Sequence, residues 1–357
     1  ACTLRDCLVE GNGSSSGGGI MVGGEATNAL VEDCTIEGNI ASNGPGGGIV
    51  LYSNSRGRVH RCIISGNSAV TLGGGVWIDQ DGTVSNCWIT GNLALAEDGG
   101  GVYMACSGST NPSRVVNSVI AGNAAARYGG GIYSVGPLGA VSPVVNCTIV
   151  SNTAGADGGG VFAYTTRFIN DIIYFNSAPT NANLNAHDSI LSCIISNCCT
   201  TSNYFWPSIT NAPAFVDAGA GDFRLATASF CIDAGTTNGA PGNDIDGNPR
   251  PRVGTPGGLS RTDIGACEYG FHFNAIRFTA TNTVQLQWDV QDRGIYRLDL
   301  ATNTAAHPTN WSWHDVAAYT NPGMAAGQFL VRTQTVAGTG PVPLSGNFRL
   351  RISHTLF

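Results

Sequence analysis

The chain has 357 residues, of which 50 are glycine and only 11% are charged, about twice the usual share of glycine and less than half the usual share of charge. Apolar residues make up 42% of the chain, which excludes a disordered protein, and the lack of a strict triplet period excludes collagen. With a net charge of −7 and no basic run, nucleic acid is not an expected partner; no apolar run is long enough to span a membrane, and no lysine is present to form a Schiff base.

A repeat of 26 to 30 residues runs through roughly the first 200 residues. Its first phrase is a Gly-Gly-Gly run that ends at Gly19, Gly48, Gly75, Gly101, Gly131 and Gly160 and is followed by Ile or Val. Its second phrase, Cys-x-Ile-x-Gly-Asn with variants, begins at Cys7, Cys34, Cys62, Cys87, Ser118, Cys147, Asp171 and Cys193. Apolar residues alternate with period two inside each repeat, which predicts strands. Such short units bury their apolar faces only by stacking, so we expect an all-β protein with a parallel β-helix of about eight rungs over residues 1–200. A leucine-rich repeat would show fixed leucines and a helical half, which the sequence lacks.

These phrases resemble the repeats of right-handed β-helix surface proteins of bacteria, including the polymorphic outer-membrane-protein type with its Gly-Gly-Gly-Ile and Asn-rich repeats. The resemblance implies a right-handed coil and a secreted or cell-surface location. It says little about activity, because the same coil carries pectate-lyase-like enzymes, phage tailspikes and adhesins.

Stacking turns each repeated position into a column. The cysteine column consists of Cys7, Cys34, Cys62, Cys87, Cys147 and Cys193, with Ser118 and Asp171 between them. We expect buried reduced thiols here, since parallel side chains suit neither disulfides nor a tetrahedral zinc site. The asparagine column consists of Asn12, Asn39, Asn67, Asn92, Asn123, Asn152 and Asn176. Asparagine tolerates left-handed backbone angles, so we expect these residues at a corner, with amides hydrogen-bonded from rung to rung.

A third column follows the glycine runs and is formed by Trp77, Tyr103, Tyr133 and Phe162. Strict alternation points these side chains outward, and an exposed aromatic stripe usually marks an interaction surface. Three interpretations stay open: sugar rings stack on it, another protein packs on it, or another part of the chain covers it.

No catalytic residue is predicted. Glycoside hydrolysis needs two carboxylates across one bond, and β-elimination needs a base with a charge-neutralising partner. The candidates in the repeat region are Asp79, Asp81, Glu97, Asp98, Asp157, His60 and His187. No two rungs present a carboxylate pair at the same register, and both histidines are isolated.

The repeat does not continue through residues 201–270. Phrases such as Ser229-Phe-Cys-Ile-Asp-Ala-Gly235 and Asp263-Ile-Gly-Ala-Cys-Glu-Tyr269 resemble the module called choice-of-anchor Q, which ends bacterial β-helix proteins. The resemblance implies a cap on the coil and, because the family brings these two phrases together, a disulfide between Cys231 and Cys267. The partners of Cys2, Cys106, Cys198 and Cys199 are not assigned.

The string Asp244-x-Asp246-Gly-Asn248 offers oxygen ligands that suit calcium, although its order differs from that of an EF-hand. Turn-forming Asp and Gly explain the same string, and this is the interpretation we favour. No other cofactor is expected.

Residues 271–357 contain no cysteine and no repeat phrase. Their short strand-like segments suggest a small β-sandwich, and the string Val-Gln-Leu-Gln-Trp288 with Asn310-Trp311 resembles a fibronectin-type-III-like module. The chain begins inside a repeat, so we expect further sequence before it.

Together these features predict a non-catalytic extracellular structural or adhesive protein, with self-association into a larger surface assembly or filament. The alternative is a protein that binds or degrades polysaccharide through the aromatic column, with surface glycans as its partners.

Overall fold

The computed structural model describes residues 2–24, 28–52, 55–106, 112–137, 140–186, 193–201, 207–251 and 261–269, and then the backbone of strands between residues 272 and 356. The chain forms two compact units. The first contains residues 1–214, 229–252 and 259–268, and the second contains residues 215–228, 253–258 and 269–357. Residues 201–270, expected as one module, are therefore divided between the two units.

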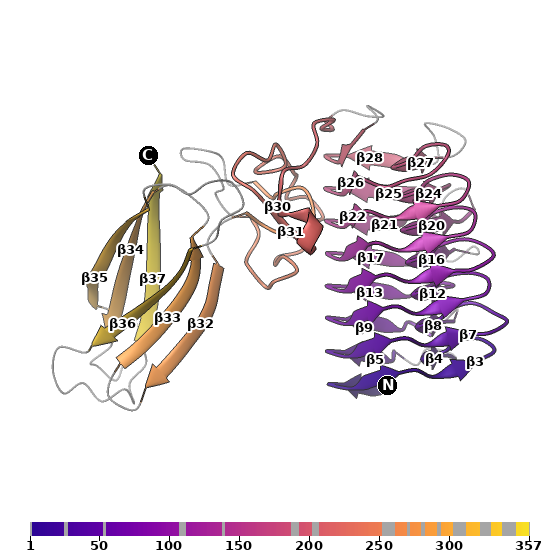
Figure 1. Ribbon diagram of the computed structural model, residues 1–357, viewed down its shortest axis with the longest axis horizontal. Coiled ribbons are helices and arrows are strands. Elements are labelled where there is room, and N and C mark those ends of the chain that lie inside the picture. The colour runs from indigo at the N-terminus through magenta and orange to yellow at the C-terminus, as the bar shows by residue number, and fades with distance from the viewer. Residues whose placement is uncertain are drawn as a thin grey trace. The chain divides into compact units, whose positions relative to one another are not determined.

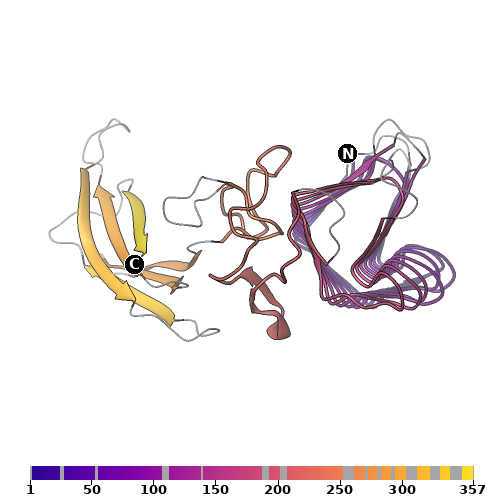
Figure 2. The same ribbon diagram turned by 90° about the horizontal axis from the view of Figure 1, so that it is seen from above.

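Residues 3–200 form a coil of four parallel sheets, and successive turns add strands to them (Figure 1). Figure 2 looks along the coil, and the turns superpose. Sheet A consists of β1 (Thr3–Arg5), β5 (Leu30–Glu32), β9 (Arg58–His60), β13 (Thr83–Ser85), β17 (Arg114–Val116), β21 (Ser142–Val145), β25 (Thr166–Ile169) and β28 (Ile194–Ser196). Sheet B consists of β2 (Leu8–Glu10), β6 (Thr35–Glu37), β10 (Ile63–Ser65), β14 (Trp88–Thr90), β18 (Val119–Ala121), β22 (Thr148–Val150), β26 (Ile172–Tyr174) and β29 (Cys199–Thr200).

The other two sheets complete each turn. Sheet C consists of β3 (Gly13–Ser14), β7 (Ile40–Ala41), β11 (Ser68–Ala69), β15 (Leu93–Ala94), β19 (Ala124–Ala125) and β23 (Thr153–Ala154). Sheet D consists of β4 (Ile20–Val22), β8 (Ile49–Leu51), β12 (Val76–Ile78), β16 (Val102–Ala105), β20 (Ile132–Val135), β24 (Val161–Ala163) and β27 (Leu184–Ala186). All pairings within the four sheets are parallel, which confirms the predicted parallel β-helix.

The core lies inside the coil and is built from stacked identical positions. Ile64 pairs with Ile36 on one side and with Ile89 on the other, and all three side chains are fully buried. Strands of two to four residues are too short to be stable alone. Their stability comes from hydrogen bonds to the turns above and below and from this shared core.

The second unit is all-β in its described part. Strands β30 (Phe215–Asp217) and β31 (Asp222–Leu225) form an antiparallel pair around the short 3₁₀ helix η1 (Ala218–Ala220). The remaining strands form two antiparallel sheets. One has the order β32 (His272–Thr279), β33 (Thr283–Val290), β36 (Leu330–Ala337); the other has the order β35 (Ser312–Asn321), β34 (Gly294–Thr302), β37 (Phe348–Leu356).

Candidate functional site

The asparagine column forms a continuous ladder of amides inside the coil. Asn92 donates to Asn123 Oδ1 from its backbone nitrogen and from Nδ2, both at 2.9 Å, and its Nδ2 also donates to the Ile64 carbonyl at 2.9 Å. The same pattern runs from Asn12 to Asn176. The left-handed residue at this corner is the one before the asparagine, usually a glycine such as Gly91 with φ of 63° but Ser151 or Phe175 on two turns, so the expectation of left-handed asparagines is wrong. These amides are engaged in holding successive turns together.

Cysteines of the interior column stack as thiols. Burial raises the pKa of the Cys87 and Cys147 thiols well above the usual range. Cys87 Sγ donates to the Ser85 carbonyl at 3.1 Å, and Ser118 continues the column because its Oγ accepts the Cys87 backbone N–H at 3.1 Å. Inert, protonated thiols are therefore expected at Cys87 and Cys147.

The assignment of Cys193 to this column is wrong. Phe168 pairs with Ile195, which places Cys198 above Asp171, and the Asp171 backbone N–H donates to Cys198 Sγ at 3.4 Å. The string Cys193-Ile-Ile-Ser-Asn197 can be aligned with a strand of sheet A or with a strand of sheet B, because strands of both sheets have an inward apolar residue at the position of Ile195. Asn197 decides the register: its φ of 53° belongs to the left-handed corner that comes directly before the cysteine column.

The aromatic column stacks ring on ring. Tyr103 and Tyr133 have ring centroids 5.0 Å apart and planes 12° apart, and Tyr133 and Phe162 have values of 5.5 Å and 5°. Phe162 is only 4% exposed, which contradicts the expectation of an exposed column, because the rings of Tyr128 and Tyr164 pack on it. Trp77, Tyr103 and Tyr133 are half-buried. Burial raises the pKa of Tyr103 to about 12. The stacked ring faces contact one another, which leaves less face for a sugar ring.

Carboxylates beside the aromatic column are engaged within their own surroundings. Asp98 Oδ1 accepts the Tyr128 backbone N–H at 3.2 Å and lies 3.8 Å from Arg127 Nε, and burial raises the pKa of Asp98. Two turns further on, Asp157 accepts the Gly158 backbone N–H and Asn185 Nδ2, both at 2.6 Å. These contacts position turns of the coil.

The two histidines named by the sequence stand apart from these carboxylates. His60 Nδ1 lies 2.9 Å from Ser85 Oγ, and burial lowers the pKa of His60. His187 lies outside the described residues.

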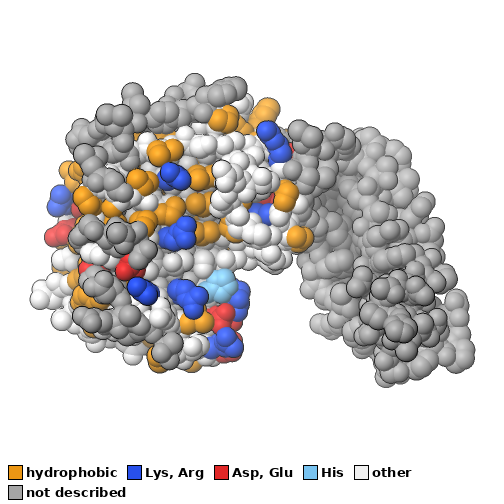
Figure 3. All heavy atoms as spheres, turned by 180° about the vertical axis from the view of Figure 1, so that it is seen from behind, with side chains coloured by type: hydrophobic (Ala, Val, Ile, Leu, Met, Phe, Trp, Pro, Cys, Tyr) orange, Lys and Arg blue, Asp and Glu red, His pale blue; other side chains and the backbone are white. Residues whose placement is uncertain are grey.

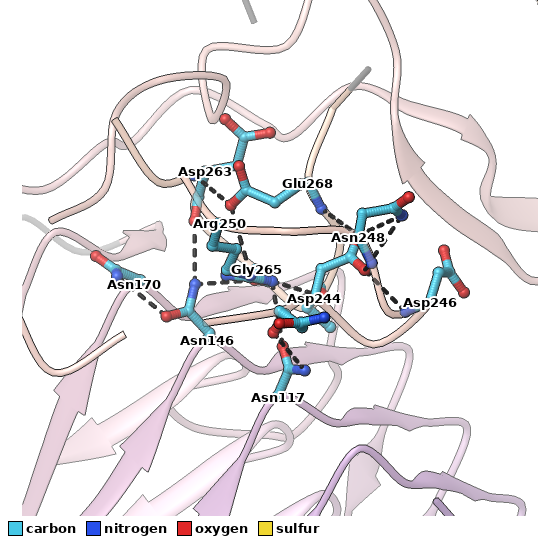
Figure 4. A network of polar contacts seen from close by, with 12 residues as sticks. Asn117, Asn146, Asn170, Asp244, Asp246, Asn248, Arg250, Asp263, Gly265 and Glu268 are labelled. Atoms are coloured by element: carbon cyan, nitrogen blue, oxygen red, sulfur yellow. Dashed lines mark hydrogen bonds and ion pairs between the residues drawn. The ribbon is translucent and has the colours of Figure 1, made fainter. Parts of the chain in front are cut away.

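A second column of asparagines, which the sequence analysis missed, anchors another part of the chain to the coil. Residues 229–251 and 261–268, here called the docked segment, belong to the same compact unit as the coil. The corner between sheets A and B supplies Asn86, Asn117, Asn146, Asn170 and Asn197, and Nδ2 of each donates to a backbone carbonyl of this segment. Figure 4 labels three of them, Asn117, Asn146 and Asn170. The donor–acceptor distances are 3.3 Å from Asn86 to the Asp244 carbonyl, 3.1 Å from Asn117 to that of Asn243 and 3.1 Å from Asn146 to that of Asp263. They are 2.8 Å from Asn170 to the Thr236 carbonyl and 3.2 Å from Asn197 to that of Ala234.

The corner changes character where the docked segment is not bound. All its residues have left-handed backbones with φ between 50° and 57°, but the first three turns carry Asp6, Asp33 and Arg61 in place of asparagine. The asparagines therefore mark the turns that bind the docked segment. A sequence signal existed, because an asparagine stands directly before the cysteine position only from the fourth turn onward.

A buried charged network closes the docked segment on the coil (Figure 4). Arg250 Nε lies 3.5 Å from Glu268 Oε1, and both side chains are almost fully buried. Arg250 Nη2 donates to the Ala266 carbonyl at 2.6 Å and to Asn117 Oδ1 at 3.2 Å. Burial lowers the pKa of Arg250, and the nearby Glu268 carboxylate opposes that shift. Removing one charge of such a pair leaves the other buried and unpaired.

The string considered for calcium forms a turn stabilised by Asp244. Asp244 Oδ1 accepts the backbone N–H groups of Asp246 at 3.0 Å and Asn248 at 2.7 Å, and Oδ2 accepts that of Glu268 at 2.9 Å. N–H donors thus occupy both carboxylate oxygens. In the described residues, no group of three or more His, Cys, Asp or Glu side chains is arranged to hold a metal ion. These bonds fit the favoured interpretation of a turn, and calcium binding at Asp244, Asp246 and Asn248 stays the untested alternative.

The cysteines of the docked segment are buried. Cys199, the outward residue of β29, donates from Sγ to the Asn211 carbonyl at 3.3 Å. The neighbouring Cys231 side chain together with burial raises the pKa of Cys199. Cys267 is 4% exposed. A disulfide between Cys231 and Cys267 remains a prediction, and Cys199 becomes a second candidate partner for Cys231.

The outward column of sheet B is mostly apolar, with Thr35 and Thr148 among Leu8, Ile63, Trp88, Val119 and Ile172, and only half of it is covered. In the covered half, the Ala266 backbone N–H donates to Thr148 Oγ1 at 3.0 Å, and a Cβ added at Gly265 would lie 2.7 Å from Ile172 Cδ1. In the other half of this outward column, Leu8 is 61% exposed and Ile63 is 48% exposed. Trp88, the next outward residue, is half-buried.

Comparison with family models matches residues 1–154 to the family described as the right handed beta helix region. Together with the parallel turns, this match confirms the predicted right-handed β-helix. No curated protein matches the chain. Within the described residues, no helix has the length and apolar character needed to cross a membrane.

Proposed function

We propose that the chain is a non-catalytic structural or adhesive protein that works outside the cell as a subunit of a larger surface assembly. The observation that carries this proposal is the half-covered outer face of sheet B. Leu8, Ile63 and Trp88, with Thr35 between the first two, are here called the open stripe, and they continue the column that the docked segment covers at Thr148 and Ile172. The docked segment covers one half of the outer face of sheet B and leaves the other half exposed, which fits a subunit whose exposed half packs on another copy.

A second open stripe is the occupant that fits best. The docked segment of another copy would present backbone carbonyls to Asp6 and Asp33, whose carboxylates would repel them where asparagine amides elsewhere attract them. Two copies related by a two-fold axis instead place open stripe against open stripe, which buries apolar surface on both sides.

The size of the open stripe sets the strength of association. Full burial of one Leu or Ile side chain contributes about 1.5–3 kcal/mol, while association costs roughly 4–15 kcal/mol. A single pair of stripes therefore associates weakly, and further contacts in an assembly have to add to it.

The non-catalytic part of the proposal rests on the engaged state of the candidate groups. Asp98 and Asp157 are hydrogen-bonded within the coil, and the Tyr103 and Tyr133 rings stack on each other. These contacts weaken the alternative of sugar binding at the aromatic column. The extracellular location rests on the resemblance of the repeated phrases to those of secreted proteins.

Sedimentation equilibrium over a wide concentration range tests the proposal. The wild-type chain should associate reversibly, and Ile63→Ser should shift association to a concentration at least about threefold higher because it removes apolar burial on both copies. Ile194→Ser is the matched control, since Ile194 is 44% exposed on sheet A. A wild-type chain that stays monomeric throughout, or equal effects of both substitutions, would refute the proposal.

A further inference from the structure

Sheet A carries exposed arginines on alternate turns of the coil. In its outward column Arg58 pairs with Thr83, which pairs with Arg114, and Pro143 pairs with Arg167. Arg58, Arg114 and Arg167, here called the arginine row, are all exposed. Figure 3 shows this side of the molecule, where Lys/Arg side chains follow one another along the coil among hydrophobic ones.

The arginine row is not neutralised by the described part of the chain. Arg5 and Arg61 form ion pairs with Glu32 on the first turns of the coil, whereas no described carboxylate forms an ion pair with the row. From β9 to β28, sheet A contains no acidic residue. From β9 onward, the described strands of sheet A thus carry only positive charge on their outer face, in a chain whose net charge is −7.

The spacing of the row is regular. Parallel strands lie about 4.8 Å apart, so arginines on every second turn lie roughly 9.6 Å apart. A linear ligand laid along the coil would meet one guanidinium at each such step. Between those steps it would meet the half-buried side chains of Thr83 and Pro143, which contribute no charge.

We propose that the arginine row binds an acidic polysaccharide whose carboxylates recur along an extended chain. Guanidinium groups recognise carboxylates through paired N–H donors. The weakly polar side chains between them suit the C–H faces of sugar rings. A nucleic acid fits less well, because its phosphates follow one another at about 3.4 Å per strand, so most of them would lie between arginines.

Each contact is weak on its own because the arginines are exposed and screened by salt. Several contacts along one polymer add up through effective concentration. The row should therefore bind long chains and not their single sugars, and high salt should abolish binding.

Isothermal titration of the full chain with polygalacturonate tests the proposal, with galacturonate monomer and neutral dextran as controls. Replacing the row as R58Q/R114Q/R167Q should weaken polygalacturonate binding on the order of tenfold or more. All three side chains are exposed, so folding should persist and is checked by urea denaturation.

A second variant separates the row from net charge. T83R/R114T keeps three arginines in the column but places them on uneven turns. We expect it to bind polygalacturonate more weakly than the wild type. Equal binding by the wild type and the triple variant, or by the wild type and T83R/R114T, would overturn the proposal.

Two further arms complete the test. Tighter binding of single-stranded DNA than of polygalacturonate through the same arginines would also overturn the proposal, in favour of a nucleic-acid surface. Ile63→Ser lies on sheet B and should leave polygalacturonate binding unchanged. Failure of this inference is therefore distinguishable from failure of the proposed self-association.

Discussion

Asn170 and Thr236 exchange two hydrogen bonds across 66 residues of chain, as two residues of paired strands would. Asn170 Nδ2 donates to the Thr236 carbonyl at 2.8 Å, and Asn170 Oδ1 accepts the Thr236 backbone N–H at 2.8 Å. The Asn170 side chain thus makes the pair of hydrogen bonds that the backbone of a neighbouring strand would otherwise make with the docked segment.

Asn170→Asp should loosen the docked segment while leaving the coil intact. A carboxylate oxygen would then face the Thr236 carbonyl, and one lost buried hydrogen bond of this kind costs about 1–3 kcal/mol. Hydrogen exchange read by mass spectrometry should show faster exchange in residues 229–251 and 261–268. The reverse change Asp6→Asn, at the same corner on the first turn, serves as the control and should leave exchange there unchanged. Uniform acceleration throughout the coil would contradict the local role of Asn170.

The asparagine ladder predicts a strong dependence on position. Asn123→Ala removes an acceptor that serves both nitrogens of Asn92 and a donor to the Ile89 carbonyl, all in a buried site. At about 1–3 kcal/mol per unsatisfied buried group, the free energy of unfolding should fall by roughly 2–5 kcal/mol. Asn12→Ala, at the exposed end of the ladder, should cost much less. Urea denaturation of the two variants makes the comparison, and similar losses would show that the ladder does not contribute as described.

Asp171 should make stability depend on pH. Burial raises the pKa of this carboxyl well above its usual range, so the folded state holds the proton more tightly than the unfolded chain does. Its contribution is complete below the ordinary aspartate pKa of about 3.9 and is lost as the pH rises towards the folded-state value.

Asp171→Ser should remove that pH dependence. Serine already occupies the same column at Ser118, where Oγ accepts a backbone N–H and donates to the Val116 carbonyl. Relative to the wild type, the variant should gain unfolding free energy between acidic and neutral pH. Parallel stability curves for the two proteins across this range would show that Asp171 does not titrate as proposed.

Mild oxidation should join Cys199 to Cys231. The two thiols are close enough for Cys231 to raise the pKa of Cys199, while the resemblance of the terminal phrases implies a bond from Cys231 to Cys267 instead. Peptide mapping of the oxidised chain by mass spectrometry distinguishes the two. A Cys231–Cys267 bond formed with Cys199 still reduced would favour the pairing implied by the family.

The sequence was sufficient for the coil and for its buried cysteine and asparagine columns. Period-two apolar residues and the positions of Cys34 or Asn67 identify the coil and its inward columns, because neighbouring turns impose the same environment on equivalent residues. It failed where the period ends: Cys193 fits the repeated phrase, but the pairing of Phe168 with Ile195 decides the register.

Contacts between distant segments were also beyond the sequence. From the sequence, Asn170 is an ordinary turn residue and Phe162 is expected to be exposed. The structure shows instead that Asn170 binds Thr236 and that the ring of Tyr128 packs on Phe162. Neither contact follows from period or composition. Thr236 reaches Asn170 through a long connection outside the coil, and Tyr128 lies at a turn position where neighbouring turns carry Asp98 and Asp157 instead.

Photo-crosslinking from position 63 tests whether the open stripes of two copies pack on each other. A benzophenone amino acid in place of the exposed Ile63 is irradiated in a mixture of unlabelled and nitrogen-15-labelled chains. We expect crosslinked peptides that contain one chain of each label and join β10 to strands β2, β6, β10 or β14 of the other copy. Crosslinks confined to single chains, or joining β10 to another face of the coil, would contradict this packing.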